Sequence, residues 1–282
     1  MTGAATALMG TPASVADYLV LRPLGDSGRY LLATPPDRLG LGGEAVALKV
    51  SAGMGSGAPR VLRELRLYAS LDSPHLVRLL DAGQEGDVFF YAMPLHPAGS
   101  LSRPATTMST ELAVAAVAAA ARGAHDLHEA GLAHADIQPA RILLGPGVGD
   151  SGGIGGGAVA AVLADLELAR SVTPGLTLTR EMPVGDLAYV DPAVVRGSRP
   201  GRAGDVWALA ATLHRVVTGV GVYPGLPGDL LAAVRHVLSG APQLDPSLPE
   251  SLRPVVAAAL SVDPADRPAT ARQLAEELEA MA

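Results

Sequence analysis

The sequence predicts an α+β fold in two lobes: a small antiparallel β-sheet with one helix, followed by a larger, mainly α-helical lobe. Between Tyr18 and about Met93, short apolar runs bounded by Gly, Pro or Asp are typical of strands. After Gly99 the apolar stretches become longer and carry helix-capping residues. The length of 282 residues and the hydrophobic content of 49% allow one large domain or two lobes with a sizeable core.

The first lobe is expected to contain five strands and one helix. The helix is expected within residues 59–71, where apolar residues recur at helical spacing: Val61, Leu62, Leu65, Tyr68 and Leu71. The strands are expected where the short apolar runs lie, at residues 18–24, 30–34, 45–50, 76–83 and 88–93. The lobe is therefore dominated by strands.

The second lobe is expected to open with a long helix and to close with a capped one. The long helix begins at Ser109 or Thr110 and ends before Gly131. Residues 205–219 are apolar nearly all round, which indicates a buried helix. Thr270 opens a capping box before the last helix. These signals predict a lobe built mainly from helices.

A glycine-rich segment at residues 145–157 separates two apolar runs. Since neither Lys-Ser/Thr nor a helix start follows it, we expect a flexible surface turn between two strands rather than a phosphate-binding loop. The patterns together predict the boundaries of four segments: a loose N-terminus at 1–15, a first lobe at 16–93, a hinge at 94–99 and a second lobe at 100–282.

Composition excludes several classes of protein. The chain has no Cys, and therefore no disulfide, no thiolate metal site and no Cys nucleophile. The net charge of −7 argues against a nucleic-acid partner, because no basic patch is available to neutralise phosphates. The most apolar long stretch, residues 112–121, is about half of a membrane span. With no signal peptide expected either, we expect no membrane segment and a cytoplasmic location.

One lysine stands out against this composition. Of the 21 Lys and Arg residues, only Lys49 is a lysine, and it lies inside an apolar strand pattern. The charge of a buried ammonium group needs a partner. Glu64, on the predicted helix of the same lobe, is the candidate. The chain also contains no Asn.

Motifs along nearly the whole chain from Tyr18 onward resemble those of a bacterial Ser/Thr protein kinase domain of the eukaryotic-like, Hanks type. Their order and spacing, more than any single motif, carry the resemblance. They are VALK at 46–49, RELRLYASL at 63–71, YAMPLHPAGSL at 91–101, HADIQPARILL at 134–144, Asp165-Leu-Glu167 in place of D-F-G, YVDPAVV at 189–195 in place of A-P-E, and DPADRP at 263–268. The resemblance implies the bilobal protein kinase fold.

The resemblance also implies an ATP site and assigns its residues. Lys49, oriented by Glu64, is expected to hold the α- and β-phosphates, Asp136 to act as the base and Asp165 to hold Mg²⁺. The hinge is expected to bind adenine through the carbonyl of Pro94 and the N–H of His96. The remaining contacts are expected from the side chains that sandwich adenine and from a shortened glycine-rich loop at 24–30: Ala47, Leu143, Gly25 and Gly28.

Several positions depart from the family pattern. Gln138 replaces the catalytic-loop lysine, Arg141 replaces the second metal-ligating Asn, and Glu167 replaces the D-F-G glycine. Removal of one preorganised charge stabiliser typically costs about 10²–10³ in rate. Other departures are Ala135 for the arginine that reads a phosphorylated loop, Asp186 for a substrate-side Thr, and Ala193 for the A-P-E glutamate that usually pairs with Arg267.

Because these departures remove phosphate and metal contacts, the resemblance predicts a degenerate kinase domain, or pseudokinase. It would act as a regulatory or scaffold module for a protein partner and bind ATP weakly. Because Arg141 replaces a metal ligand, binding of Mg²⁺ is not expected. Arg141 either pairs with Asp165 in place of the metal or contacts phosphate directly. Two alternatives stay open: an active Ser/Thr kinase with a non-standard metal site, and a small-molecule phosphotransferase.

Three further sets of residues carry weaker hypotheses. The packing positions Tyr68, His134 and Leu166, with Asp205 as their anchor, remain suitable for a kinase core. In the segment that corresponds to an activation loop, either phosphoacceptors or an ordinary polar loop is expected at Thr173, Thr177 and Thr179. A rival metal site would use His125, His128, His134 and Asp136; without it, the two helix histidines 125 and 128 are expected at the surface.

Overall fold

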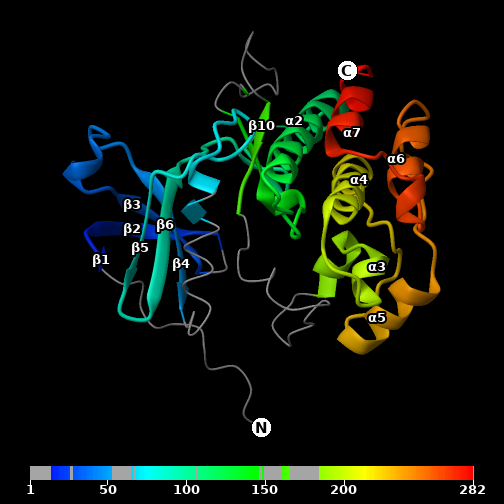
Figure 1. Cartoon of the computed structure of the whole chain (residues 1–282), viewed down its shortest axis with the longest axis horizontal. Coiled ribbons are helices and arrows are strands. Elements are labelled where there is room, and N and C mark those ends of the chain that lie inside the picture. The colour runs from blue at the N-terminus through cyan, green and yellow to red at the C-terminus, as the bar shows by residue number, and fades with distance from the viewer. Residues whose placement is uncertain are drawn as a thin grey trace. The chain divides into compact units, whose positions relative to one another are not determined.

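The computed structural model describes residues 14–25, 28–52, 65–66, 68–105, 107–145, 148, 160–165 and 184–281. The chain divides into two compact units, one from the ranges Met1–Ala69 and Val77–Leu95, the other from Ser70–Leu76 and His96–Ala282. The first unit holds an antiparallel sheet, and the second is mainly helical (Figure 1). The predicted α+β fold is therefore confirmed.

The first unit is built on a six-stranded antiparallel sheet in the order β1-β2-β3-β4-β6-β5. Two of the predicted strands, at 18–24 and 30–34, match at both ends, and two more, at 45–50 and 88–93, are found within two residues of their expected ends. A bulge between Val20 and Arg22 interrupts the pairing of β2 with β3. The strands are β1 (Ser14–Val15), β2 (Tyr18–Leu24), β3 (Tyr30–Thr34), β4 (Val46–Ala52), β5 (Asp81–Glu85) and β6 (Val88–Pro94).

One face of this sheet carries the core of the first unit. Because side chains alternate between the two faces of a strand, Val46 and Leu48 of β4 point into this core and the residues between them do not. The buried members of the core are Val15, Tyr18, Leu31, Ala33, Val46, Leu48, Phe90 and Ala92. The Tyr18 hydroxyl donates to the Asp81 carboxylate at 2.7 Å, which ties β2 to β5.

The predicted strand at 76–83 is wrong in its position. The strand lies at Asp81–Glu85, where it forms a hairpin with β6. Leu76 and Val77 are buried but belong to no named strand. The apolar run therefore marks burial rather than pairing. Of the predicted helix at 59–71, residues 65, 66 and 68–71 are described; residues 65, 66, 68 and 69 are helical, whereas 70 and 71 are not, so the helix ends before the predicted end.

The second unit packs helices around the long helix α2 (Thr110–Glu129). Its buried face is rich in alanine, and α4 (Arg202–Thr218) and α7 (Ala271–Glu279) pack against it (Figure 1). Trp207, Leu209 and Leu213 of α4 are at most 1% exposed and fill this core. The remaining helices are α3 (Pro192–Val195), α4 (Arg202–Thr218), α5 (Leu230–Ser239), α6 (Arg253–Ala259) and α7 (Ala271–Glu279), with 3₁₀ turns η1 (Asp37–Leu39, in the first unit), η3 (Pro139–Arg141), η5 (Val184–Tyr189) and η6 (Pro264–Asp266).

The helix ends follow the capping residues that the sequence contains. Ser109 caps α2, its hydroxyl accepting from the Leu112 N–H at 3.1 Å. Thr270 caps α7 by accepting from the Gln273 N–H at 3.1 Å. Gly219 ends α4 at a φ of +74°, the left-handed conformation that glycine adopts without strain. The start of α4 lies three residues before the predicted start at 205.

A small second sheet joins two short strands that precede α2 with two that follow it, in the order β10-β9-β7-β8. Its strands are β7 (Gly99–Ser100), β8 (Arg103–Pro104), β9 (Ile142–Leu144) and β10 (Ala161–Leu163). The strands β9 and β10 pair in antiparallel register on either side of the glycine-rich segment. Most of that segment, including residues 149–157, lies outside the described residues, so its expected turn stays a prediction.

The segment Ser70–Leu76 packs with the helical unit although its neighbours in sequence belong to the sheet unit. The His75 carbonyl accepts from the Leu163 N–H at 2.8 Å. It also abuts α2 at Gly123, where an added Cβ would lie 2.6 Å from the His75 oxygen. Only glycine allows this close approach of helix and loop.

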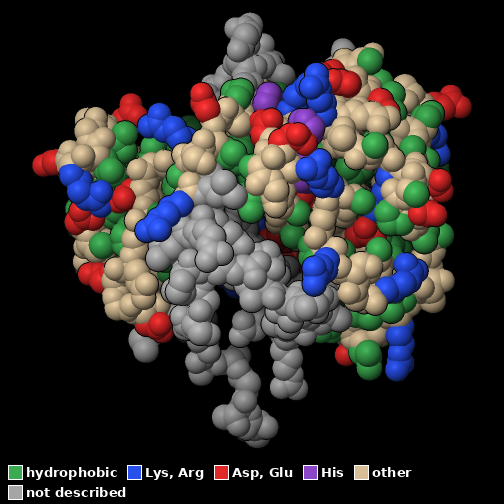
Figure 2. All heavy atoms as spheres, viewed as in Figure 1, with side chains coloured by type: hydrophobic (Ala, Val, Ile, Leu, Met, Phe, Trp, Pro, Cys, Tyr) green, Lys and Arg blue, Asp and Glu red, His purple; other side chains and the backbone are tan. Residues whose placement is uncertain are grey.

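The described surface mixes charges of both signs. On the face shown in Figure 2, Lys and Arg side chains are interspersed with Asp and Glu over the described residues. Among the helices of the described part of the chain, none is long and apolar enough to span a bilayer.

Candidate functional site

In the first unit, β4 presents Ala47 and Lys49 on the sheet face that lies opposite the core. Lys49 lies in the middle of the strand, as the sequence predicts, and is only 6% exposed. Glu64, its expected partner, lies outside the described residues. The Lys49–Glu64 ion pair therefore stays a prediction, whereas the burial of the ammonium side chain is a feature of the described structure.

Two glycines flank the turn between β2 and β3. Gly25 and Gly28 have φ values of +70° and +65°, in the left-handed region that favours glycine. The two residues between them lie outside the described part of the chain. The backbone conformation thus explains both glycines, and their role toward a nucleotide stays a prediction.

The predicted hinge residues fall in both units. Pro94 ends β6, opposite Val46 of β4. In the second unit, the Nδ1 atom of His96 lies 3.1 Å from the carbonyl oxygen of Leu144. Burial lowers the pKa of His96, so the neutral ring donates this hydrogen bond. Leu143 lies half-buried in β9, next to this contact.

The second unit brings Asp136, Arg141 and Asp165 together. The Arg141 Nε and Nη2 atoms lie 3.1 and 3.0 Å from Oδ2 of Asp136. Its Nη1 atom lies 2.6 Å from Oδ2 of Asp165. The side chain of Arg141 is 16% exposed, that of Asp136 8% and that of Asp165 2%. One guanidinium therefore bridges the two carboxylates to which the resemblance assigns base and metal ligand.

Neighbouring groups hold this triad in place. Gln138 donates from Nε2 to the other Asp136 oxygen, Oδ1, at 3.2 Å. The 3₁₀ turn η3 positions Arg141, whose carbonyl accepts from the Ala164 N–H at 2.8 Å. Asp165 adopts a φ of +67°, which is uncommon for a residue with a Cβ atom. Both oxygens of Asp136 are thus occupied by protein donors.

The positions that the resemblance assigns to the base and the metal ligand contact a cationic side chain. Mg²⁺ requires near-octahedral oxygen ligation, whereas Arg141 places a cation between the two carboxylates that the described residues bring together here. Across the described ranges, no group of three or more His, Asp or Glu side chains could hold a metal. His128 and His134 of the rival metal hypothesis contact the Asp205 carboxylate and the Ala164 carbonyl, respectively.

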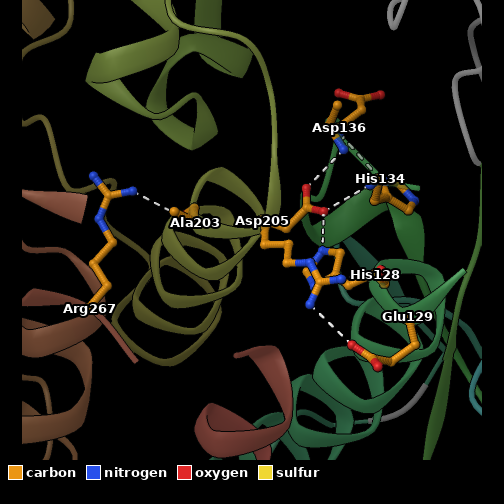
Figure 3. Close-up of polar contacts among 9 residues, drawn as sticks. His128, Glu129, His134, Asp136, Ala203, Asp205 and Arg267 are labelled. Atoms are coloured by element: carbon orange, nitrogen blue, oxygen red, sulfur yellow. Dashed lines mark hydrogen bonds and ion pairs between the residues drawn. The ribbon is translucent and has the colours of Figure 1, made fainter. Parts of the chain in front are cut away.

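Asp205 of α4 anchors the loop that carries Asp136 (Figure 3). Its Oδ2 atom accepts from the His134 N–H and lies 2.8 Å from Nε2 of His128. Its Oδ1 atom accepts from the Ala135 N–H at 2.8 Å. His128 is 1% exposed, so the expectation of a surface position for this residue is wrong. Its spacing on α2 places it on the helix face that packs against α4.

The anchored loop contains a strained backbone. Ala135 has a φ of +63°, a conformation that costs a residue with a Cβ atom roughly 1–2 kcal/mol. His134 is buried, and its Nε2 atom lies 3.0 Å from the Ala164 carbonyl oxygen. The Tyr68 hydroxyl donates to the Val77 carbonyl within the first unit. Leu166, another predicted packing residue, lies outside the described residues.

Arg267 finds a partner that the motif comparison missed. Its Nη1 and Nη2 atoms lie 2.6 and 3.1 Å from the two Asp191 oxygens. The guanidinium also stacks over Trp207, 5.0 Å from the ring centroid. Asp191 lies two residues before Ala193, the position of the missing glutamate, and is the only acidic residue of YVDPAVV. This single acidic residue is the sequence signal that could have identified the partner of Arg267.

The segment that corresponds to an activation loop is described only at its end. Asp186 lies in η5, whereas Thr173, Thr177 and Thr179 lie outside the described residues. Their phosphorylation stays a prediction.

Four histidines that are partly or fully buried lead us to expect that stability changes with pH. Burial lowers the pKa of His75, His96, His134 and His214. The ring of His214 bridges the Val220 carbonyl and the Asp245 N–H, both at 2.9 Å. An unfolded histidine titrates near 6.5, so below this pH the unfolded chain binds more protons than the native one. We expect the free energy of unfolding to be constant above about pH 7 and to decrease as the pH is lowered to 5.5.

Urea titrations at pH 7.5, 6.5 and 5.5 measure this slope. The variant His214→Gln is expected to be less stable at pH 7.5 and to lose part of the slope. A wild-type stability that is constant or increases between pH 7.5 and 5.5 contradicts the prediction.

Comparison with known proteins identifies the family of this chain. Residues 42–278 match the model of the protein kinase domain. The chain is 33% identical over 251 residues to the serine/threonine-protein kinase PkaA of Streptomyces coelicolor, covering 85% of this chain and 44% of PkaA. It is 32% identical over 255 residues to the DNA damage-responsive serine/threonine-protein kinase RqkA of Deinococcus radiodurans, covering 85% and 36%.

A third relative, the serine/threonine-protein kinase PknJ of Mycobacterium tuberculosis, is 29% identical over 270 residues, covering 92% of this chain and 44% of PknJ. The fold and these matches define a kinase domain of the eukaryotic-like class. The chain belongs to the protein kinase family. It spans less than half the length of these relatives.

Proposed function

We propose that this chain is a pseudokinase, a kinase domain with impaired phosphoryl transfer that acts in the cytoplasm as a regulatory or scaffold module for a protein partner. The observation that carries the proposal is the Arg141 guanidinium between Asp136 and Asp165. It ties up a carboxylate oxygen of each residue and supplies the positive charge that the resemblance assigns to a metal ion.

Charge at the triad supports this proposal. Two ionised carboxylates and one guanidinium carry a net charge of −1, which does not attract the phosphates of ATP. Phosphoryl transfer depends on positioning and on cations that neutralise the transferred group. Gln138, which donates to Asp136, replaces the lysine expected to supply such a charge. Loss of two such stabilisers is expected to leave little activity.

Packing contacts support a role as a folded module. Asp205 still holds the catalytic loop, and Arg267 has its replacement partner in Asp191. The contacts that hold the fold together are therefore kept, whereas the residues expected to neutralise phosphate are replaced. A protein surface does not need phosphoryl transfer to bind a partner.

The second candidate is an active Ser/Thr kinase with a non-standard metal site. It is favoured by the presence of Lys49, Asp136 and Asp165, which would bind phosphate, act as base and hold one metal ion. The third, a small-molecule phosphotransferase, would use the same residues. Both candidates require Mg²⁺- or Mn²⁺-dependent transfer of the γ-phosphate, which separates them from the pseudokinase.

One assay separates these functions. Purified protein is incubated with labelled ATP, Mg²⁺ or Mn²⁺, and either a generic protein substrate or an aminoglycoside. We expect incorporation no higher than in the controls Asp136→Ala and Lys49→Met. Incorporation that both substitutions abolish overturns the pseudokinase proposal, and the substrate that is labelled then distinguishes the two enzyme candidates.

The variant Arg141→Asn tests the role of the guanidinium directly. It leaves two neighbouring carboxylates without their shared cation, so we expect the free energy of unfolding to fall by about 3 kcal/mol. Mg²⁺ should then bind the two carboxylates and raise the Tm of the variant by mass action. The Tm of the wild type, with or without ATP, should be the same in Mg²⁺ and in EDTA at matched ionic strength.

The matched control is Arg122→Asn, which breaks the partly exposed ion pair of Arg122 with Glu279. This control should lose at most about 1 kcal/mol and gain no response to Mg²⁺. The role of Arg141 in place of a metal ion is contradicted if the Tm of the wild type rises with Mg²⁺, or if the Tm of the Arg141→Asn variant does not.

A further inference from the structure

Two tyrosines flank the single lysine of the chain. In the sheet of the first unit, Tyr30 of β3 lies directly opposite Lys49 of β4, and Lys49 lies directly opposite Tyr91 of β6. Residues that are directly opposite each other in adjacent strands share one face of the sheet. The three side chains therefore form a row across three strands, with Lys49 in the middle.

The distances in this row fit cation–π interactions. The Lys49 Nζ atom lies 5.7 Å from the ring centroid of Tyr30 and 5.6 Å from that of Tyr91. A cation within about 6 Å of a ring centroid is attracted to the ring face, and the attraction grows when the cation is removed from water. Lys49 is 6% exposed, so both interactions take place largely away from solvent.

Composition argues against simple space-filling by the two tyrosines. The chain has only nine Phe, Trp and Tyr residues among 282, and elsewhere it fills its core mainly with aliphatic side chains. On the opposite sheet face the same strands carry mainly aliphatic side chains, Leu31, Leu48 and Ala92, with Phe90 as the one ring among them. Two of the few rings nevertheless flank the single ammonium side chain, which indicates that the ring faces themselves are used.

We propose that Tyr30 and Tyr91 are positioning residues that clamp the Lys49 ammonium group between two ring faces. The clamp fixes the direction of the lysine side chain before any ligand arrives. Only the identity of that ligand, a nucleotide phosphate, rests on the function proposed above. The clamp itself rests on the strand register, the ring distances and the burial of Lys49.

The single lysine makes the clamp directly measurable. In protein labelled with ¹³C-lysine, the only lysine Hε/Cε cross-peak belongs to Lys49, and ring currents shift it away from its position in the unfolded chain. We expect Tyr30→Leu and Tyr91→Leu each to move the peak toward the unfolded position. Tyr30→Phe and Tyr91→Phe should keep it shifted, because they preserve the ring.

Phe89→Leu is the matched control, because Phe89 lies on the same strand and face as Tyr91 but opposite Ser51. It should leave the lysine peak in place. Each variant is first shown to be folded by its cooperative thermal transition. A peak that stays in place in both leucine variants, or that moves equally in leucine and phenylalanine variants, overturns the proposal.

A second readout follows the reactivity of the amine. Acylation of Lys49 by a soluble ester, located by mass spectrometry, should be about tenfold faster in the double leucine variant than in the wild type. An unchanged rate counts against the clamp. Both measurements are made without nucleotide, so a negative result overturns the clamp and leaves the proposed function untouched.

Discussion

Replacing Asp205 with alanine is expected to lower the free energy of unfolding by about 4 kcal/mol. The carboxylate accepts the backbone N–H groups of His134 and Ala135 and contacts His128, all at 2.8 Å. Alanine leaves these buried donors without an acceptor. It also releases Ala135 from the contact that holds its left-handed backbone. The loop that carries Asp136 should therefore lose its order along with global stability.

Urea unfolding measured by circular dichroism checks this prediction. The matched control is Asp229→Ala, in which an exposed aspartate loses one N-cap bond to the Ala232 N–H. Such a cap contributes about 1 kcal/mol. If the two alanine variants lose the same free energy, the anchoring role of Asp205 is contradicted.

Breaking the pair of Arg267 and Asp191 should have the second large effect. Arg267→Met leaves a buried carboxylate uncompensated, and we expect a loss of about 4 kcal/mol. Asp191→Ser keeps a capping hydroxyl for α3 but leaves the guanidinium unpaired, so its loss should be about 3 kcal/mol. The double variant should be more stable than the sum of these losses predicts, because it leaves neither charge unpaired.

A double-mutant cycle in urea measures this coupling. The comparison cycle uses Arg122 and Glu279, whose side chains are 29% and 45% exposed. The coupling of that pair should be below about 1 kcal/mol. Additive losses at Arg267 and Asp191 would show that the two side chains do not stabilise each other.

The sequence predicted best those elements whose signals are local. The helix α2 has its cap at Ser109, and strands β2 and β3 begin and end where the apolar runs do. The strand predicted at 76–83 failed because periodicity reports burial. Leu76 and Val77 are buried by tertiary packing, whereas the polar strand Asp81–Glu85 forms through its hairpin with β6.

The sequence allowed us to predict which residues form the candidate site, but not which of them contact one another. Motif spacing identified Asp136, Arg141 and Asp165, and charge alone allowed the ion pair between the last two. The contact of Arg141 with Asp136 could not be predicted, because the direction of a long side chain depends on the turn η3 and on the packing around it. Asp191 was missed because motif alignment compares positions, whereas Arg267 reaches whichever carboxylate lies close enough.

The placement of Ser70–Leu76 decides how the protein can be dissected. Because this segment packs with the helical unit while residues on both sides of it belong to the sheet unit, the chain passes between the units three times. A fragment starting at His96 would lack the acceptor of the Leu163 N–H and would uncover α2 at Gly123. A single cut therefore does not yield a complete helical unit, and binding experiments with partners require the intact chain.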